Sequence, residues 1–181
     1  MSDQPLHPRI AEVVGALRDA QHDMQTLLDL VPAALAEQRP ANDRWSAAEV
    51  VEHLAMVEEG TGRLIGTLLK QVAGTSDPDT APIAPTLDRF GVADATTRPI
   101  EAPPSVSPGG TLTLADALAR QTAARERVVG ALIAASGRAL GSVTYAHPVL
   151  GALDGYQWAL FLAQHQRRHF PQLRAILDAQ S

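Results

Sequence analysis

The sequence predicts an all-α fold, a four-helix bundle with a long crossover connection between its second and third helices. Four stretches carry apolar residues at the 3.6-residue spacing of an amphipathic helix, and a proline-rich stretch, 73–111, separates the middle two. Apolar residues make up 45% of the chain but aromatic residues only 4%, so Ala, Leu and Val dominate the core and favour closely packed helices. A length of 181 residues suits a single domain covering residues 1–181.

The first two helices are expected over residues 8–31 and 46–72. Ser46 and Glu49 have the S-x-x-E spacing of a capping box, in which each side chain binds the backbone N–H of the other residue. Trp45 lies just before this box and is expected to act as a hydrophobic staple. The start of the second helix is therefore the best-marked helix end in the chain.

The connection between the second and third helices cannot form a sustained helix, because proline removes a backbone donor and clashes with the preceding turn. Seven prolines fall between residues 73 and 111: Pro78, Pro82, Pro85, Pro99, Pro103, Pro104 and Pro108. A loop of this length in a compact domain is usually a functional cover or a linker. Leu87 and Phe90 are expected to dock residues 86–92 on the helices.

The last two helices are expected over residues 114–135 and 153–178, joined by a connection at 137–148. Pro171 lies inside the fourth helix, two residues after a histidine, and removes one backbone hydrogen bond. A kink is therefore expected near residue 171.

Three histidines fall on the apolar stripes of the second and fourth helices, where a solvated imidazole is not expected. His165 and His169 lie one turn apart on the fourth helix, and His53 shares its stripe with valines and leucines of the second. If the two stripes meet, three imidazoles converge, and three nitrogen ligands with a vacant position are typical of an open metal site. The alternative is that each histidine is a hydrogen-bonded core residue.

Other polar residues are candidates for supporting roles. Gln121 and Arg125 lie on the apolar stripe of the third helix, which predicts either an internal polar network or a pocket for a polar ligand. Arg125 could instead extend to the surface along its aliphatic stem. Glu52 and Glu59 point away from the stripe of His53 and are expected at the surface, and His147 is interpreted as a turn residue.

Charge and composition exclude several classes of protein. The net charge is −5 and the basic residues are scattered, so a nucleic-acid partner is not expected. The chain has no cysteine, which excludes disulfides, thiolate nucleophiles and cysteine-ligated zinc. Neither a signal peptide nor an apolar stretch of membrane-spanning length is present, so a cytoplasmic location without a membrane partner is expected.

Three segments, taken in order, resemble the DinB-like superfamily, which includes the YfiT-like metal-dependent hydrolases. They are WSAAEVVEHL at 45–54, EAPPSVSPGG at 101–110 and HPVLGALDGYQWALFLAQHQRRHFPQL at 147–173. The resemblance implies a four-helix bundle whose three histidines bind a divalent metal, commonly zinc or nickel. Those ligands correspond to His53, His165 and His169. Pro171 departs from the pattern of the family.

Members of that superfamily with known activity include transferases that use a low-molecular-weight thiol such as bacillithiol or mycothiol, and a maleylpyruvate isomerase. The resemblance therefore implies a metal-dependent transferase or hydrolase acting on a small-molecule substrate, with Gln121 and Arg125 as candidates for binding its polar part. The alternative is a non-catalytic binding or structural protein whose metal site is structural or vestigial. A dimeric interaction protein without metal is a third hypothesis. A homodimer is compatible with the first two.

Overall fold

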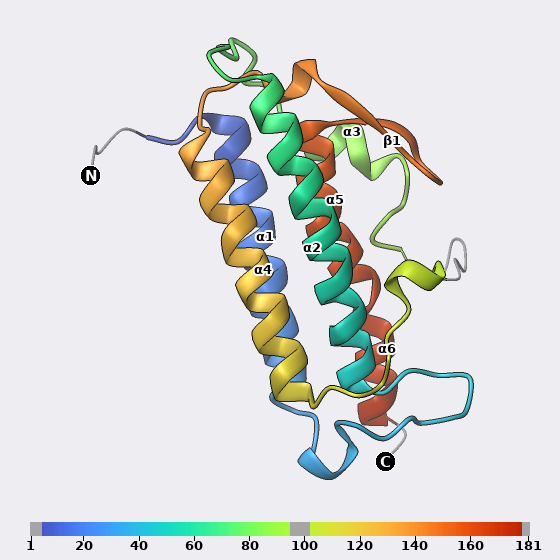
Figure 1. Ribbon diagram of the computed structural model, residues 1–181. Helices are drawn as coiled ribbons and strands as arrows, with labels where there is room; N and C mark the ends of the chain where they lie inside the picture. Colours follow the sequence, from blue (N-terminus) through green and yellow to red (C-terminus); the bar gives the residue numbers. More distant parts are fainter. Residues whose placement is uncertain (1–4, 95–101, 179–181) are drawn as a thin grey trace.

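The computed structural model describes residues 5–94 and 102–178, and it is mostly helical, as predicted. The long helices lie side by side along a common direction (Figure 1). They are α1 (Pro8–Leu28), α2 (Ala47–Gln71), α4 (Leu114–Ala134) and α5 (Gly155–Arg168), and α6 (Phe170–Asp178) continues the course of α5. The helix α2 packs against both α4 and α5, and α1 packs against the same two helices. No helix in the described part of the chain is long and apolar enough to cross a membrane.

The order of the helices brings the two histidine-bearing segments together. Helices α2 and α4 run in the same direction, while α1 and α5 run in the opposite one (Figure 1). The chain therefore returns to the starting end of α2 before α4 begins. Since α5 packs directly against α2, residues on the facing sides of these helices can meet in space.

The helix starts follow the capping signals in the sequence. The capping box at Ser46 is confirmed: its hydroxyl accepts from the N–H of Glu49, and its own N–H donates to the Glu49 carboxylate. Asp154 and Gln157 form a second capping box at the start of α5. Thr113 caps α4 by accepting from the N–H of Asp116.

The kink expected near residue 171 is a break, which divides the expected fourth helix into two helices. Helix α5 ends at Arg168, His169 is its C-cap residue, and α6 starts at Phe170 with Pro171 in its first turn. Proline is tolerated there because the first N–H groups of a helix have no partner within the helix. The break places His169 at a helix junction.

The described part of the connection between α2 and α4 contains two short helical elements, α3 (Ala84–Asp88) and the 3₁₀ turn η2 (Pro104–Val106). Another 3₁₀ turn, η1 (Ala33–Leu35), lies between α1 and α2. Leu87 is fully buried, and Phe90 packs against the core, so the predicted docking of residues 86–92 is confirmed. Glu12 of α1 anchors this docking by accepting from the N–H groups of Ile83 and Ala84.

A small antiparallel hairpin occupies the end of the expected loop at 137–148 and the first residues of the expected fourth helix. The prediction of an all-α fold is corrected to this extent. Strands β1 (Thr144–His147) and β2 (Gly151–Asp154) pair with His147 opposite Gly151. The tight turn between them needs Gly151, whose φ is +81°. A third 3₁₀ turn, η3 (Leu140–Ser142), precedes the hairpin. Helix α5 therefore starts two residues later than expected.

Candidate metal centre

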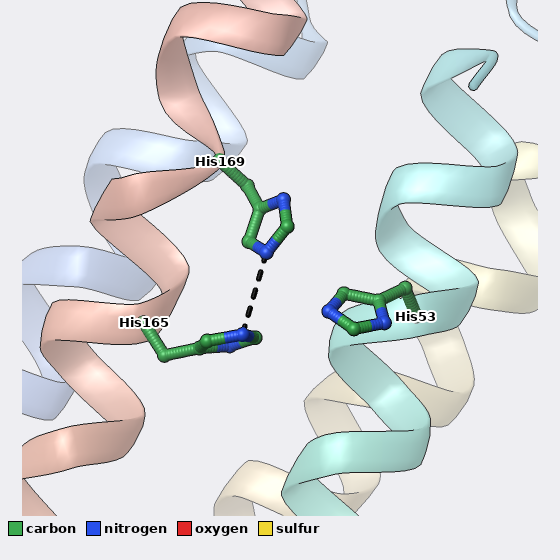
Figure 2. A group of neighbouring side chains, drawn as sticks. All are labelled: His53, His165 and His169. Atoms are coloured by element: carbon green, nitrogen blue, oxygen red, sulfur yellow. Dashed lines mark hydrogen bonds between the residues drawn. The ribbon is translucent and has the colours of Figure 1, made fainter. Parts of the chain in front are cut away.

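The structure brings His53, His165 and His169 to one point between α2 and the junction of α5 and α6. Figure 2 shows the three imidazoles pointing toward one another across the space between the helices. One nitrogen of each ring lies within 4.8 Å of the others. Among the described residues, no other group of three or more His, Asp or Glu side chains is arranged so that it could hold a metal ion.

The spacing of the imidazole nitrogens fits a metal ion. A tetrahedral zinc ion with zinc–nitrogen distances near 2.05 Å separates its ligand atoms by about 3.3 Å. The Nε2 atoms of His165 and His169 are 3.4 Å apart, close to this value (Figure 2). The same distance is long for a hydrogen bond to a ring nitrogen. The pair therefore fits two ligands of one ion better than a donor and an acceptor.

Two of the rings are oriented by hydrogen bonds from their outer nitrogens. His53 Nδ1 donates to the carbonyl oxygen of Val106 at 2.8 Å, and His169 Nδ1 donates to Gln172 Oε1 at 2.6 Å. Because the proton lies on Nδ1 in both rings, the lone pair of each ring lies on Nε2, toward the centre. Such outer partners fix the tautomer and the orientation of histidine ligands in metal sites.

The three imidazoles are kept neutral by their surroundings. Burial lowers the pKa of His53, and the hydrogen bond to Val106 opposes that shift only in part. Burial, followed by the charge of His53, lowers the pKa of His169 to about 4. Burial and the neighbouring histidines hold the pKa of His165 well below its ordinary value. Neutral rings with free lone pairs are the form that binds a metal ion.

Residues 102–110, here called the strap, hold the outer side of His53 in place. The carboxylate of Glu52 accepts from the N–H groups of Gly109 and Gly110, both at 3.1 Å. Gly110 has a φ of +69°, and a Cβ on it would lie 2.9 Å from Glu49 Oε1. The strap carries the carbonyl of Val106 that orients His53. Glu52, expected at the surface, is thus buried, whereas Glu59 is partly exposed in an ion pair with Arg120.

A cavity of about 1450 Å³ opens beside the three histidines, and all three line it. Its walls come from α2, the α3 region, the strap, the hairpin and α5. Asp43 is the one carboxylate among the described residues that line it. The cavity therefore combines a nitrogen donor set with walls that are largely apolar.

An aromatic wall connects the hairpin to the histidines. The ring of Phe161 lies 4.9 Å from that of His147 and 5.3 Å from that of His165, measured between ring centroids. Trp158 lies 5.2 Å from His147 on the same wall. On the other side, Trp45 lies 5.0 Å from His53, so the predicted staple residue also contacts the centre. His147 lies at the end of β1 and lines the cavity, a position that its place before Pro148 did not indicate.

Arg125 takes part in an internal polar network, one of the three outcomes considered for its position. Its guanidinium donates to both carboxylate oxygens of Glu58, to Gln166 Oε1 and to the carbonyl of Leu17, at 2.6–2.8 Å. Gln121 is fully buried, and neither of its amide atoms has a partner among the described residues. Neither Arg125 nor Gln121 lines the cavity, and their binding of substrate stays a prediction.

The fold and the site together define a mostly helical protein with a three-histidine group able to hold a metal ion. A family model of the DinB superfamily matches residues 16–173. The chain therefore belongs to the DinB superfamily, as its three sequence segments indicated. Comparisons with curated proteins and with solved structures gave no significant match.

Proposed function

We propose that the protein binds one divalent metal ion, zinc or nickel, through His53, His165 and His169, and is a metal-dependent enzyme. The observation that carries the proposal is the convergence of three neutral imidazoles, two of them with Nε2 turned inward by outer hydrogen bonds. We describe the scaffold as a four-helix bundle with a crossover between α2 and α4, in line with the helix directions.

Transfer of a low-molecular-weight thiol to a small-molecule substrate is the reaction that we favour over hydrolysis. A bound divalent ion lowers the pKa of a thiol or water beside it, which makes thiolate or hydroxide available near neutral pH. The cavity, at about 1450 Å³, exceeds the 300–1000 Å³ typical of a single ligand and has room for a thiol and a second substrate. Zincins carry a glutamate base in HExxH, whereas Gln166, Arg167 and Arg168 fill this interval.

The residues of the chain would hold the site and shape its access. Val106 and Gln172 orient the rings of His53 and His169, and the aromatic wall lines one side of the cavity. The alternative is a structural or vestigial metal in a non-catalytic protein. Structural zinc sites have closed ligand sets. That all three histidines line a large cavity supports an open, catalytic position instead.

The first experiment measures metal in protein purified without an affinity tag. We expect about one equivalent of zinc or nickel per chain, because three nitrogen ligands would hold one ion. The metal should be lost in His53→Ala and in His165→Ala. His22→Ala, at an exposed position on α1, is the matched control and should retain the metal. Equal metal content in all four proteins would show that the ligand set is wrong.

The second experiment separates thiol transfer from a structural role. Cobalt-substituted protein is titrated with cysteine, and we expect a sulfur-to-cobalt charge-transfer band. The same sample should then conjugate cysteine to chlorodinitrobenzene faster than the His165→Ala variant does. A metal-loaded protein that shows neither the band nor conjugation would favour the structural alternative.

The homodimer, the cytoplasmic location and the lack of nucleic-acid and membrane partners remain predictions. The oligomeric state is measured directly by light scattering after size-exclusion chromatography.

A further inference from the structure

The hairpin fixes which nitrogen of His147 carries the proton. His147 Nδ1 accepts from the backbone N–H groups of Val149 and Leu150, at 3.1 and 3.2 Å. A nitrogen that accepts two N–H donors has its lone pair there, so the proton of the neutral ring lies on Nε2. Burial lowers the pKa of His147, which favours this neutral form. The ring therefore offers one N–H donor of known position.

The Nε2–H donor has no protein partner within the described ranges 5–94 and 102–178. In these ranges the ring of His147 forms hydrogen bonds only through Nδ1. His147 is half-buried and lines the cavity. An N–H group on a partly buried residue that lines a cavity can pair with a ligand, and such pairing avoids the cost of an unsatisfied donor.

The position of His147 relates the donor to the proposed metal. Its ring packs on Phe161, which in turn packs on His165, with centroid distances of 4.9 and 5.3 Å. Trp158 lies 5.2 Å from His147 and 5.8 Å from Phe161, so the three rings form one cluster. A flat molecule lying along this wall would therefore have one end near His165 and a polar atom within reach of His147.

The lip of the cavity near His147 is also apolar. Tyr145 and Val149 of the hairpin line the cavity and are 56% and 43% exposed, values that are high for large apolar side chains. Exposed apolar side chains at the entrance of a cavity are typical of a site that receives an apolar ligand.

We propose that His147 is a substrate-positioning residue, whose Nε2–H donates a hydrogen bond to a carbonyl or carboxylate oxygen of the substrate. The substrate class is a flat, largely apolar molecule, whose apolar part lies against Trp158 and Phe161. This inference rests on the proposed function, because it assigns the substrate of the same metal centre.

The test uses cobalt-loaded protein and two chelating probes, 4-acetylbenzohydroxamate and benzohydroxamate, whose binding is followed by the change in the cobalt absorption spectrum. Both probes chelate the metal through the hydroxamate group, but only the first carries a carbonyl oxygen at its far end. His147→Phe keeps an aromatic ring on Phe161 and Trp158 but removes the donor. We expect it to bind cobalt as the wild type does and to bind 4-acetylbenzohydroxamate about 5- to 10-fold more weakly, the effect of one neutral hydrogen bond. His147→Gln, which keeps an N–H donor at similar reach, should recover most of that affinity.

A second variant tests the apolar surface separately. Phe161→Leu should weaken both probes by the same factor, whereas His147→Phe should weaken 4-acetylbenzohydroxamate and leave benzohydroxamate unchanged. If His147→Phe acted only by displacing the hairpin, both probes would bind more weakly by the same factor and His147→Gln would not restore affinity. Either result overturns the proposal. Wild-type affinity for both probes in cobalt-loaded His147→Phe also overturns it while leaving the metal site intact. Failure of the wild type to bind cobalt refutes the proposed function and this inference with it.

Discussion

Removal of the Arg125 guanidinium should destabilise the protein strongly, because the residue is paired in the interior. Arg125 and Glu58 are 4% and 3% exposed in their side chains, and the guanidinium makes four hydrogen bonds. In Arg125→Met the Glu58 carboxylate would remain buried without its counter-charge, which typically costs about 3–5 kcal/mol. For a chain of this size that loss lowers Tm by about 6–20 °C.

The same two helices provide a matched control. Arg120 and Glu59 form a bidentate ion pair of similar geometry between α4 and α2, but the two side chains are 38% and 25% exposed. Arg120→Met should therefore cost only about 0–1 kcal/mol, as exposed ion pairs do. The two variants differ mainly in the burial of the pair.

Urea unfolding followed by circular dichroism gives the free energy of unfolding for each variant. The double variant Glu58→Leu/Arg125→Met should be much more stable than the sum of its single changes predicts, because the unpaired charge is gone. A loss below about 1 kcal/mol in Arg125→Met, or simple additivity in the double variant, would refute the reasoning. Folded Arg125→Met should still bind metal, since the residue lies outside the cavity.

Two further predictions concern the metal centre. Gln172→Leu removes the acceptor of His169 Nδ1–H and should lower zinc affinity about 10- to 100-fold. The affinity is measured by competition with a chelator, and an unchanged value would exclude an orienting role for Gln172. In metal-free protein the pKa of His169 is lowered from 6.5 to about 4, so the unfolded chain binds more protons than the folded one between these pH values. The free energy of unfolding should therefore fall as the pH decreases from about 6.5 to 4, and His169 alone should account for about 3 kcal/mol of the loss. Urea unfolding at pH 7 and pH 4.5 tests this, and an equal loss of stability in the wild type and in His169→Leu would contradict it.

Local signals in the sequence were enough to predict the long helices and to place the three histidines on apolar stripes, whereas their convergence was conditional on the two stripes meeting. The capping box at Ser46 and the proline at 171 act within one turn, so their structural effects can be read from neighbouring residues. His53, His165 and His169 were found because each interrupts an apolar stripe with a polar ring. Periodicity detects such an interruption without knowledge of the partner.

The features that the sequence did not predict depend on partners distant along the chain. Glu52 faces away from the stripe of His53. Its burial depends on Gly109 and Gly110 of the strap, which lie 57 and 58 residues later in the chain. The partner of Arg125 is Glu58, 67 residues away, and no local pattern identifies it. The hairpin strands have four residues each, too short for an alternation of apolar and polar residues to stand out.

The hydrogen bond from His53 to Val106 joins a proposed metal ligand to the long connection between α2 and α4. If His53 binds the metal as we propose, its orientation by Val106 would link metal binding thermodynamically to docking of the strap. The linkage is reciprocal: the factor by which the metal stabilises the docked strap equals the factor by which docking increases metal affinity. A molecule that enters the cavity and shifts the strap would thus change how tightly the ion is held, and the metal affinity would report on the position of the loop.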